Sequence, residues 1–177
     1  MIKIRKATHE DFEIISYLGN QTFKESFGDL FLPQELDEYL HAAFNPLKIK
    51  GSLLKQDNFY GIVYIDQIPA GYYKLKLNSD LSGKEEQMLI QLQKIYILNE
   101  YLDLGLGNSM MQEIFSFAKD CNGSLIWLVV LQTNLRAIRY YVKNGFEIFK
   151  EHFYQIGSKN LKFHIMTRNI NTQESGL

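Results

Sequence analysis

The stretch from Leu92 to Gly107, LQKIYILNEYLDLGLG, constrains the fold of this chain more than any other. Its apolar run, residues 95–98, is rich in the β-branched and aromatic side chains typical of a strand. After a short loop, Gly105 and Gly107 open a segment whose apolar residues recur at helical spacing. Such a corner can cradle an anion, because glycines let the backbone turn tightly and the unpaired amides of the first helical turn point at the ligand. Corners of this kind are common in α/β proteins, so a purely structural turn remains the alternative.

The other elements follow in an order that argues against a doubly wound nucleotide fold. Antiparallel strands come first, and one β-α-β unit in the middle forces a locally parallel pair. Met110 stands where the third glycine of a G-x-G-x-x-G fingerprint would be, which argues against dinucleotide binding. We expect strands over residues 2–5, 59–65, 70–77, 89–98, 125–131, 146–149 and 161–167, and helices over 8–23, 33–44, 47–55, 107–122 and 134–143.

Length and charge narrow the classes of function. The 177 residues predict one domain, residues 1–170, followed by a flexible tail, 171–177. With a net charge of −1 the chain has no basic excess, so neither nucleic acid nor a membrane is an expected partner. Cys121, the single cysteine, can form no internal disulfide and has no metal-ligand spacing around it. We therefore expect a cytoplasmic protein without a metal site.

A motif in the second half adds specificity to the glycine corner. It reads Asn134-x-x-Ala137-x-x-x-Tyr141-x-x-x-Gly145-Phe146. Together with Gly105-x-Gly107 at this distance, it resembles the GNAT superfamily of acetyl-coenzyme A-dependent N-acetyltransferases, over nearly the whole chain. The resemblance implies an α+β, three-layer GNAT fold, with a mixed, mostly antiparallel sheet and one central parallel β-α-β unit. Shorter matches are similar to the PaiA-type polyamine acetyltransferases; they are Thr22-Phe23-x-Glu25-x-Phe27-Gly28, Tyr39-Leu40-x-x-Ala43-Phe44, Gly71-Tyr72-x-Lys74-Leu75 and His152 with Gly157.

The resemblance assigns residues to acetyl-coenzyme A, the expected co-substrate. The pantetheine arm would pair with the backbone edge of the central strand, and the pyrophosphate would lie on the amides that follow it. The implied cofactor-binding residues are Ile95, Tyr96, Ile97, Leu102, Asp103, Leu104, Gly105, Leu106, Gly107, Asn108, Asn134 and Tyr141. Asn134 also suits a plain helix N-cap, a role compatible with binding.

The resemblance makes Tyr141 the general acid that protonates the departing thiolate, while the alternative is a core aromatic. Family members often carry a glutamate on the central strand, but this chain has Gln91 and Gln93 there, and amides cannot act as bases. Glu25 is the best remaining carboxylate for the second catalytic role, with an exposed helix charge as its alternative. The amide of Ile97 would hold the acetyl carbonyl oxygen.

Departures from the PaiA-type pattern bear on the acceptor. Asp103 adds a negative charge to the anion loop, and Leu102 replaces the usual Arg or Gln. The last hairpin has Ser158, Lys159 and Phe163 where acidic residues are expected, and a polycation site needs carboxylates. The leading hypothesis is acetyl transfer to a primary amine of a small molecule, with a polyamine as one candidate. The alternatives are a degenerate domain that binds coenzyme A as a sensor or partner module, and an N-acetyltransferase of proteins or peptides. A homodimer is left open, since many members of the family are dimers.

Overall fold

The computed structural model describes residues 1–85, 88–156 and 159–170. The chain divides into two compact units, which are described separately. The first unit comprises Met1–Leu75 and Lys94–Met110, and the second comprises Lys76–Gln93 and Met111–Leu177. Gly157 of the PaiA-type match, the departure at Ser158 and the tail 171–177 lie outside the described residues.

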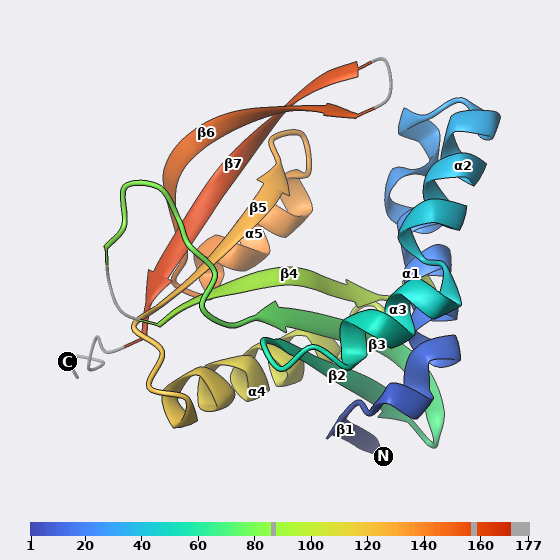
Figure 1. The fold of residues 1–177 in the computed structure, drawn as a ribbon, viewed down its shortest axis with the longest axis horizontal. Coiled ribbons are helices and arrows are strands. Elements are labelled where there is room, and N and C mark those ends of the chain that lie inside the picture. The colour runs from blue at the N-terminus through green and yellow to red at the C-terminus, as the bar shows by residue number, and fades with distance from the viewer. Residues whose placement is uncertain (86–87, 157–158, 171–177) are drawn as a thin grey trace. The chain divides into compact units, whose positions relative to one another are not determined.

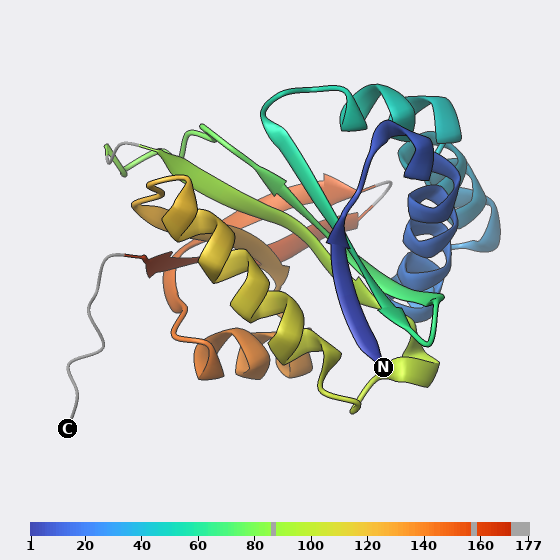
Figure 2. The ribbon, with the colours of Figure 1, turned by 90° about the horizontal axis from the view of Figure 1, so that it is seen from below.

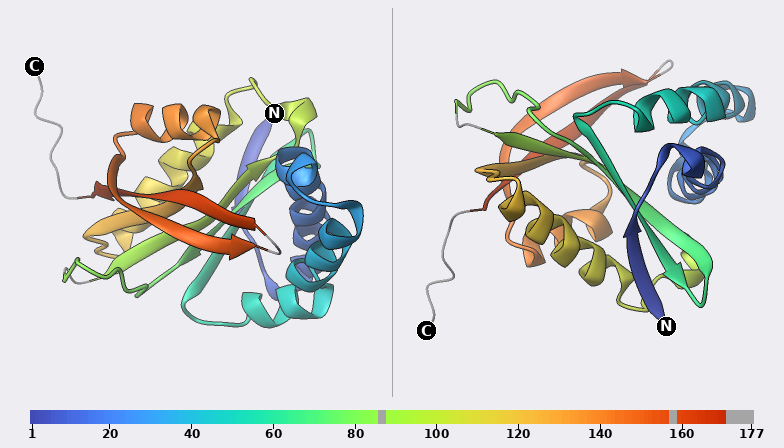
Figure 3. Two further views of the ribbon diagram at one scale, coloured as in Figure 1. Left: turned by 90° about the horizontal axis from the view of Figure 1, so that it is seen from above. Right: turned by 60° about the horizontal axis from the view of Figure 1, so that its bottom comes forward.

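The first unit is a layer of helices on a sheet (Figure 3). Its strands pair in the order β1-β2-β3-β4, with β1 and β2 antiparallel, and β4 continues into the second unit. The strands are β1 (Ile2–Lys6), β2 (Asn58–Ile65), β3 (Ile68–Lys76) and β4 (Leu89–Ile97), and the helices are α1 (Phe12–Phe27), α2 (Pro33–Ala43) and α3 (Pro46–Leu53). Asp66 and Gln67 take positive φ between β2 and β3, as the tight turns of hairpins require.

Polar residues at the helix starts explain these boundaries. Thr8 and Asp11 form a capping box ahead of α1. Pro33 occupies the first turn of α2, where its missing N–H costs nothing. Asn45 accepts hydrogen bonds from the amides of Leu47 and Lys48 at the start of α3. Residues 47–55, expected to be helical, therefore lie largely in a separate third helix.

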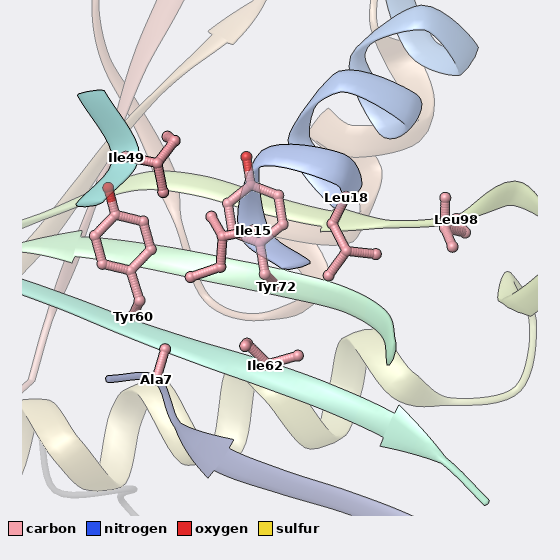
Figure 4. Packing of buried hydrophobic residues seen from close by; sticks show 8 residues of the cluster. All are labelled: Ala7, Ile15, Leu18, Ile49, Tyr60, Ile62, Tyr72 and Leu98. Atoms are coloured by element: carbon pink, nitrogen blue, oxygen red, sulfur yellow. The ribbon is translucent and has the colours of Figure 1, made fainter. Parts of the chain in front are cut away.

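Apolar side chains of α1 and α3 pack on the strands of the first unit (Figure 4). Ile15 and Leu18 are fully buried on the inner face of α1, and Tyr72 faces them from β3. The buried members of this cluster are Ala7, Ile15, Leu18, Ile49, Tyr60, Ile62, Tyr72 and Leu98. Burial of a large side chain contributes roughly 1.5–3 kcal/mol, so this cluster fixes the helices on the sheet.

The second unit is built on strands in the order β4-β5-β7-β6. Strand β4 pairs in parallel with β5 over Leu89–Gln91, and β7 is antiparallel to both β5 and β6. The remaining elements are α4 (Leu106–Asp120), β5 (Leu125–Leu131), α5 (Leu135–Lys143), β6 (Glu147–Ile156) and β7 (Lys159–Asn169). Figure 1 shows β6 and β7 as a long hairpin, and Figure 2 shows α4 and α5. Helix α4 is followed by Asn122 in the left-handed conformation, which is common just after a helix C-terminus.

The order of strands and helices and the central parallel pair confirm the expected fold. The last two strands are longer than the predicted 146–149 and 161–167. Their ladder extends from Glu147–Thr167 to Ile156–Lys159, with an irregularity between Ile148 and Lys150. Residues 151–155 are exposed on this hairpin, and their sequence, EHFYQ, lacks the alternation of polar and apolar residues by which a strand is recognised. No helix in the described part of the chain is long and apolar enough to cross a bilayer.

Candidate functional site

Strand β3 supports the last residues of β4 at very close range. A Cβ added to Gly71 would lie 2.4 Å from the carbonyl oxygen of Tyr96 and 3.0 Å from the Cα of Ile97. The amide of Leu98 donates to the carbonyl of Ala70 at 2.9 Å just beyond this point. The paired range of β4 with β5 ends at Gln91, so the segment Ile95–Ile97 lies beyond it. Glycine at position 71 therefore allows the backbone of Ile95–Ile97 to lie this close to β3.

The loop after β4 turns sharply into α4. A short 3₁₀ helix, η3 (Asn99–Tyr101), ends at Leu102, whose amide donates to the carbonyl of Asn99 at 3.2 Å. Asp103 and Gly105 both have positive φ, and both are exposed. The carbonyl of Gly105 accepts the first helical hydrogen bond, from Ser109, at 3.2 Å.

Helix α4 begins just after Gly105, so its first amides lie at the positive end of the helix dipole. Leu106, the first residue of α4, is buried and anchors the turn. An exposed loop before a 15-residue helix is a position where the helix dipole favours an anion. The amide of Leu102 is engaged within η3, so the residues that follow it are the better candidates for this role.

Glu25 lies in the last turns of α1 and is exposed. Its Oε2 accepts a hydrogen bond from the amide of Asn99 at 2.9 Å, although 74 residues separate the two in sequence. This contact ties α1 to the end of β4 and places a carboxylate at the start of η3. The structure thus brings Glu25 together with the segment that carries Ile95–Ile97.

The amides of Gln91 and Gln93 form a hydrogen-bonded set in the second unit. Gln93 Nε2 donates to Gln91 Oε1 at 2.9 Å, and the hydroxyl of Ser79 lies 3.3 Å from the same oxygen. The backbone carbonyl of Ser79 accepts from Trp127 Nε1 at 3.0 Å. These side chains hold one another in place, and neither amide can take a proton.

The second unit also holds the two predicted residues of α5. Asn134 Oδ1 accepts from the amide of Ala137 at 3.1 Å, which confirms the predicted N-cap. Tyr141 is half-buried, and its ring meets Phe146 edge-on, with centroids 5.8 Å apart. Burial raises the pKa of the neighbouring Tyr140 well above its usual value, which makes that phenol a poorer proton donor.

Lys94 is a half-buried cation that the sequence reasoning overlooked. Its ammonium lies 5.4 Å from the centre of the Phe44 ring and 5.6 Å from that of the Tyr96 ring. Burial, with a smaller contribution from the like charge of Lys48, lowers the pKa of Lys94 to about 8. Its position could have been noticed in the sequence, because a charged residue inside a largely apolar strand is unusual.

Comparison with known proteins decides the family. The model of the acetyltransferase (GNAT) family matches residues 20–146. The chain belongs to the GNAT acetyltransferase family. An uncharacterized N-acetyltransferase of Lactobacillus delbrueckii is 23% identical over 156 residues, which are 88% of this chain and 90% of that protein. The spermidine N(1)-acetyltransferase of Thermoplasma acidophilum is 20% identical over 151 residues, covering 83% of this chain and 89% of the relative.

A solved structure shares the GNAT fold. The PaiA N-acetyltransferase of Thermoplasma acidophilum in complex with coenzyme A superposes with a TM-score of 0.77 at 18% sequence identity, covering 96% of this chain and 99% of the other. This GNAT chain is therefore an N-acetyltransferase that uses acetyl-coenzyme A. Its own residues fit that donor, since the exposed loop at Gly105 leads into a helix N-terminus, a position that favours the negative charge of a pyrophosphate.

Proposed function

We propose that this GNAT enzyme transfers the acetyl group of acetyl-coenzyme A directly to a primary amine of a small molecule. One observation supports the proposal: β4, the positive-φ turn at Gly105 and the first turn of α4 follow one another directly along the chain. In the proposed complex, the outward edge of Ile95–Ile97 pairs with the pantetheine arm, and the amides of residues 104–108 hold the pyrophosphate. Bound acetyl-coenzyme A supplies an activated thioester, so the chain needs no nucleophile of its own.

Tyr141 is the proposed general acid. A phenol with a pKa of ~10 donating to a thiolate with a pKa of ~8.5 is mildly uphill in water, so positioning has to supply the difference. The edge-on contact with Phe146 restrains the Tyr141 ring, and Asn134 caps the helix that carries it. Tyr140 is the natural control, because burial raises its pKa further and makes it the weaker acid.

The acceptor must lose a proton before it attacks. An amine with a pKa of ~10.4 is neutral in only about one molecule in a thousand at pH 7. Glu25 is the proposed proton acceptor, acting directly or through water, because its carboxylate is held at the end of β4 by the amide of Asn99. The glutamines on β4 cannot take this role.

The relatives and the last hairpin give opposing indications about the acceptor amine. The spermidine acetyltransferase relative supports a polyamine, and Lys159 and Phe163 of the last hairpin, which replace expected acidic residues, count against it. Free-thiol release from acetyl-coenzyme A should be measured with spermidine and other small amines against a no-acceptor blank, from pH 7 to 9. Release should grow as the amine deprotonates.

Two variants test the residues. Tyr141→Phe should lower turnover about a hundredfold or more with little change in coenzyme A affinity, whereas Tyr140→Phe should stay near the wild type. Equal turnover of Tyr141→Phe and wild type would refute the assignment. Tight binding of acetyl-coenzyme A without thiol release for any amine or peptide would instead indicate a binding module.

A further inference from the structure

Lys94 is positioned beside the segment assigned to the donor. It lies on β4, two residues before Tyr96, so about 7 Å of strand separates their Cα atoms. Its ammonium contacts the rings of Phe44 and Tyr96, which places the side chain on the face of β4 that meets the helices. Lys94 therefore lies on the same strand as Ile95–Ile97, the edge proposed for the donor.

No anion within the described residues neutralises this charge. The contacts of Lys94 there are the two aromatic rings, and the charged group that acts on it is Lys48, another cation. The ammonium of Lys48 lies 3.1 Å from the carbonyl oxygen of Ala42. A third lysine, Lys74, lies over the Tyr60 ring of the same helix-facing cluster.

Removing an ammonium from water is costly unless an opposite charge compensates, and a second cation nearby adds to the cost. An anionic ligand would relieve both penalties at once. An incoming polycation would meet repulsion at the same place, where the rings of Phe44 and Tyr96 already contact Lys94.

From this arrangement we infer that Lys94 selects an acceptor amine that also carries a carboxylate, as an amino acid does. The inference rests on the proposed function and narrows its acceptor class. Lys94 is a specificity-determining residue in this proposal, since the ammonium binds the carboxylate while the acceptor's amine attacks the acetyl group. The acceptor class then differs from that of the spermidine acetyltransferase relative.

A matched pair of amines tests the inference. Ornithine and putrescine differ by one carboxylate, so the ratio of their KM values in thiol release reports recognition of that group. Wild type should favour ornithine about tenfold or more, as expected for a hydrogen-bonded charge pair. Lys94→Met should raise the KM for ornithine about tenfold to a hundredfold and leave putrescine unchanged or improved. Lys94→Arg should retain most of the preference.

Lys50→Met is the matched control, because Lys50 is also a half-buried lysine over an aromatic ring, 5.1 Å from that of Phe12, but lies on α3. It should keep the wild-type ratio. A wild type that prefers putrescine or spermidine, or an unchanged ratio in Lys94→Met, would overturn the inference.

Calorimetry separates this inference from the proposed function. Binding of ornithine and putrescine to the protein saturated with coenzyme A gives a ratio of Kd values that does not depend on turnover. Thiol release with none of the amines would refute the proposed transfer. A Lys94-dependent preference in Kd would still support the assigned acceptor class, and equal Kd values would overturn it.

Discussion

Replacing Gly71 with alanine should disturb the proposed donor edge without touching a catalytic side chain. The new Cβ would lie 2.4 Å from the carbonyl oxygen of Tyr96 and 3.0 Å from the Cα of Ile97. Both are backbone atoms, so β3 and the end of β4 must move apart. Overpacking of this kind costs about 1–3 kcal/mol, and loss of the Leu98–Ala70 hydrogen bond adds about 1 kcal/mol. We expect a loss of about 2–4 kcal/mol in the free energy of unfolding.

Urea unfolding measures the stability of the variant, and calorimetry measures its affinity for coenzyme A. Gly71→Ala should bind coenzyme A at least several-fold more weakly under conditions where the variant is still folded. Gly51→Ala is the control, since a Cβ there meets nothing within 4 Å and position 51 is inside α3, where alanine is expected to stabilise by ~0.5–1 kcal/mol. Wild-type stability and coenzyme A affinity in Gly71→Ala would refute the close-approach argument.

Three further substitutions test the contacts and the loop around the proposed site. Arg5 holds the pKa of the Asp11 carboxyl below its usual value. The stability from this pair is therefore present above pH ~4 and is lost as the pH falls through the lower pKa of the folded state. Asp11→Asn should lower the free energy of unfolding by about 1–3 kcal/mol at pH 7 and remove this loss at acid pH, as measured by urea unfolding at several pH values. The pKa of Lys94 is lowered to about 8 in the folded protein, so above that pH the unfolded chain binds more protons than the folded one. The free energy of unfolding should therefore rise by about 1–2 kcal/mol between pH 8 and 10. Lys94→Met should lack this rise. Gly105→Ala places a side chain in open space at a φ of +78°, which strains the backbone by about 1 kcal/mol. Urea unfolding should show this loss of stability, and calorimetry should show weaker binding of coenzyme A. Unchanged binding would argue against this loop as the anion site.

Local chemistry made much of the fold predictable. Thr8, Asn134 and Asn122 act at helix ends through their own backbone neighbourhood, so their roles could be inferred from a few adjacent residues. Strand β5 is an uninterrupted apolar run, and its predicted and observed limits agree. The β6–β7 hairpin was underestimated because a ladder of backbone hydrogen bonds continues where the side chains are exposed and polar and apolar residues do not alternate.

The acceptor side depends on contacts that no local pattern encodes. The carboxylate of Glu25 reaches an amide 74 positions away, and Lys94 reaches the ring of Phe44 across 50 positions of sequence. Each position taken alone is an ordinary charge on a helix or in a strand. Only the fold shows that one carboxylate supports the backbone at the end of β4, while a nearby lysine on the same strand has no anion among the described residues. The proposed donor site, built from backbone amides, can therefore be predicted from glycine spacing, whereas the proposed acceptor specificity depends on charges placed by tertiary structure.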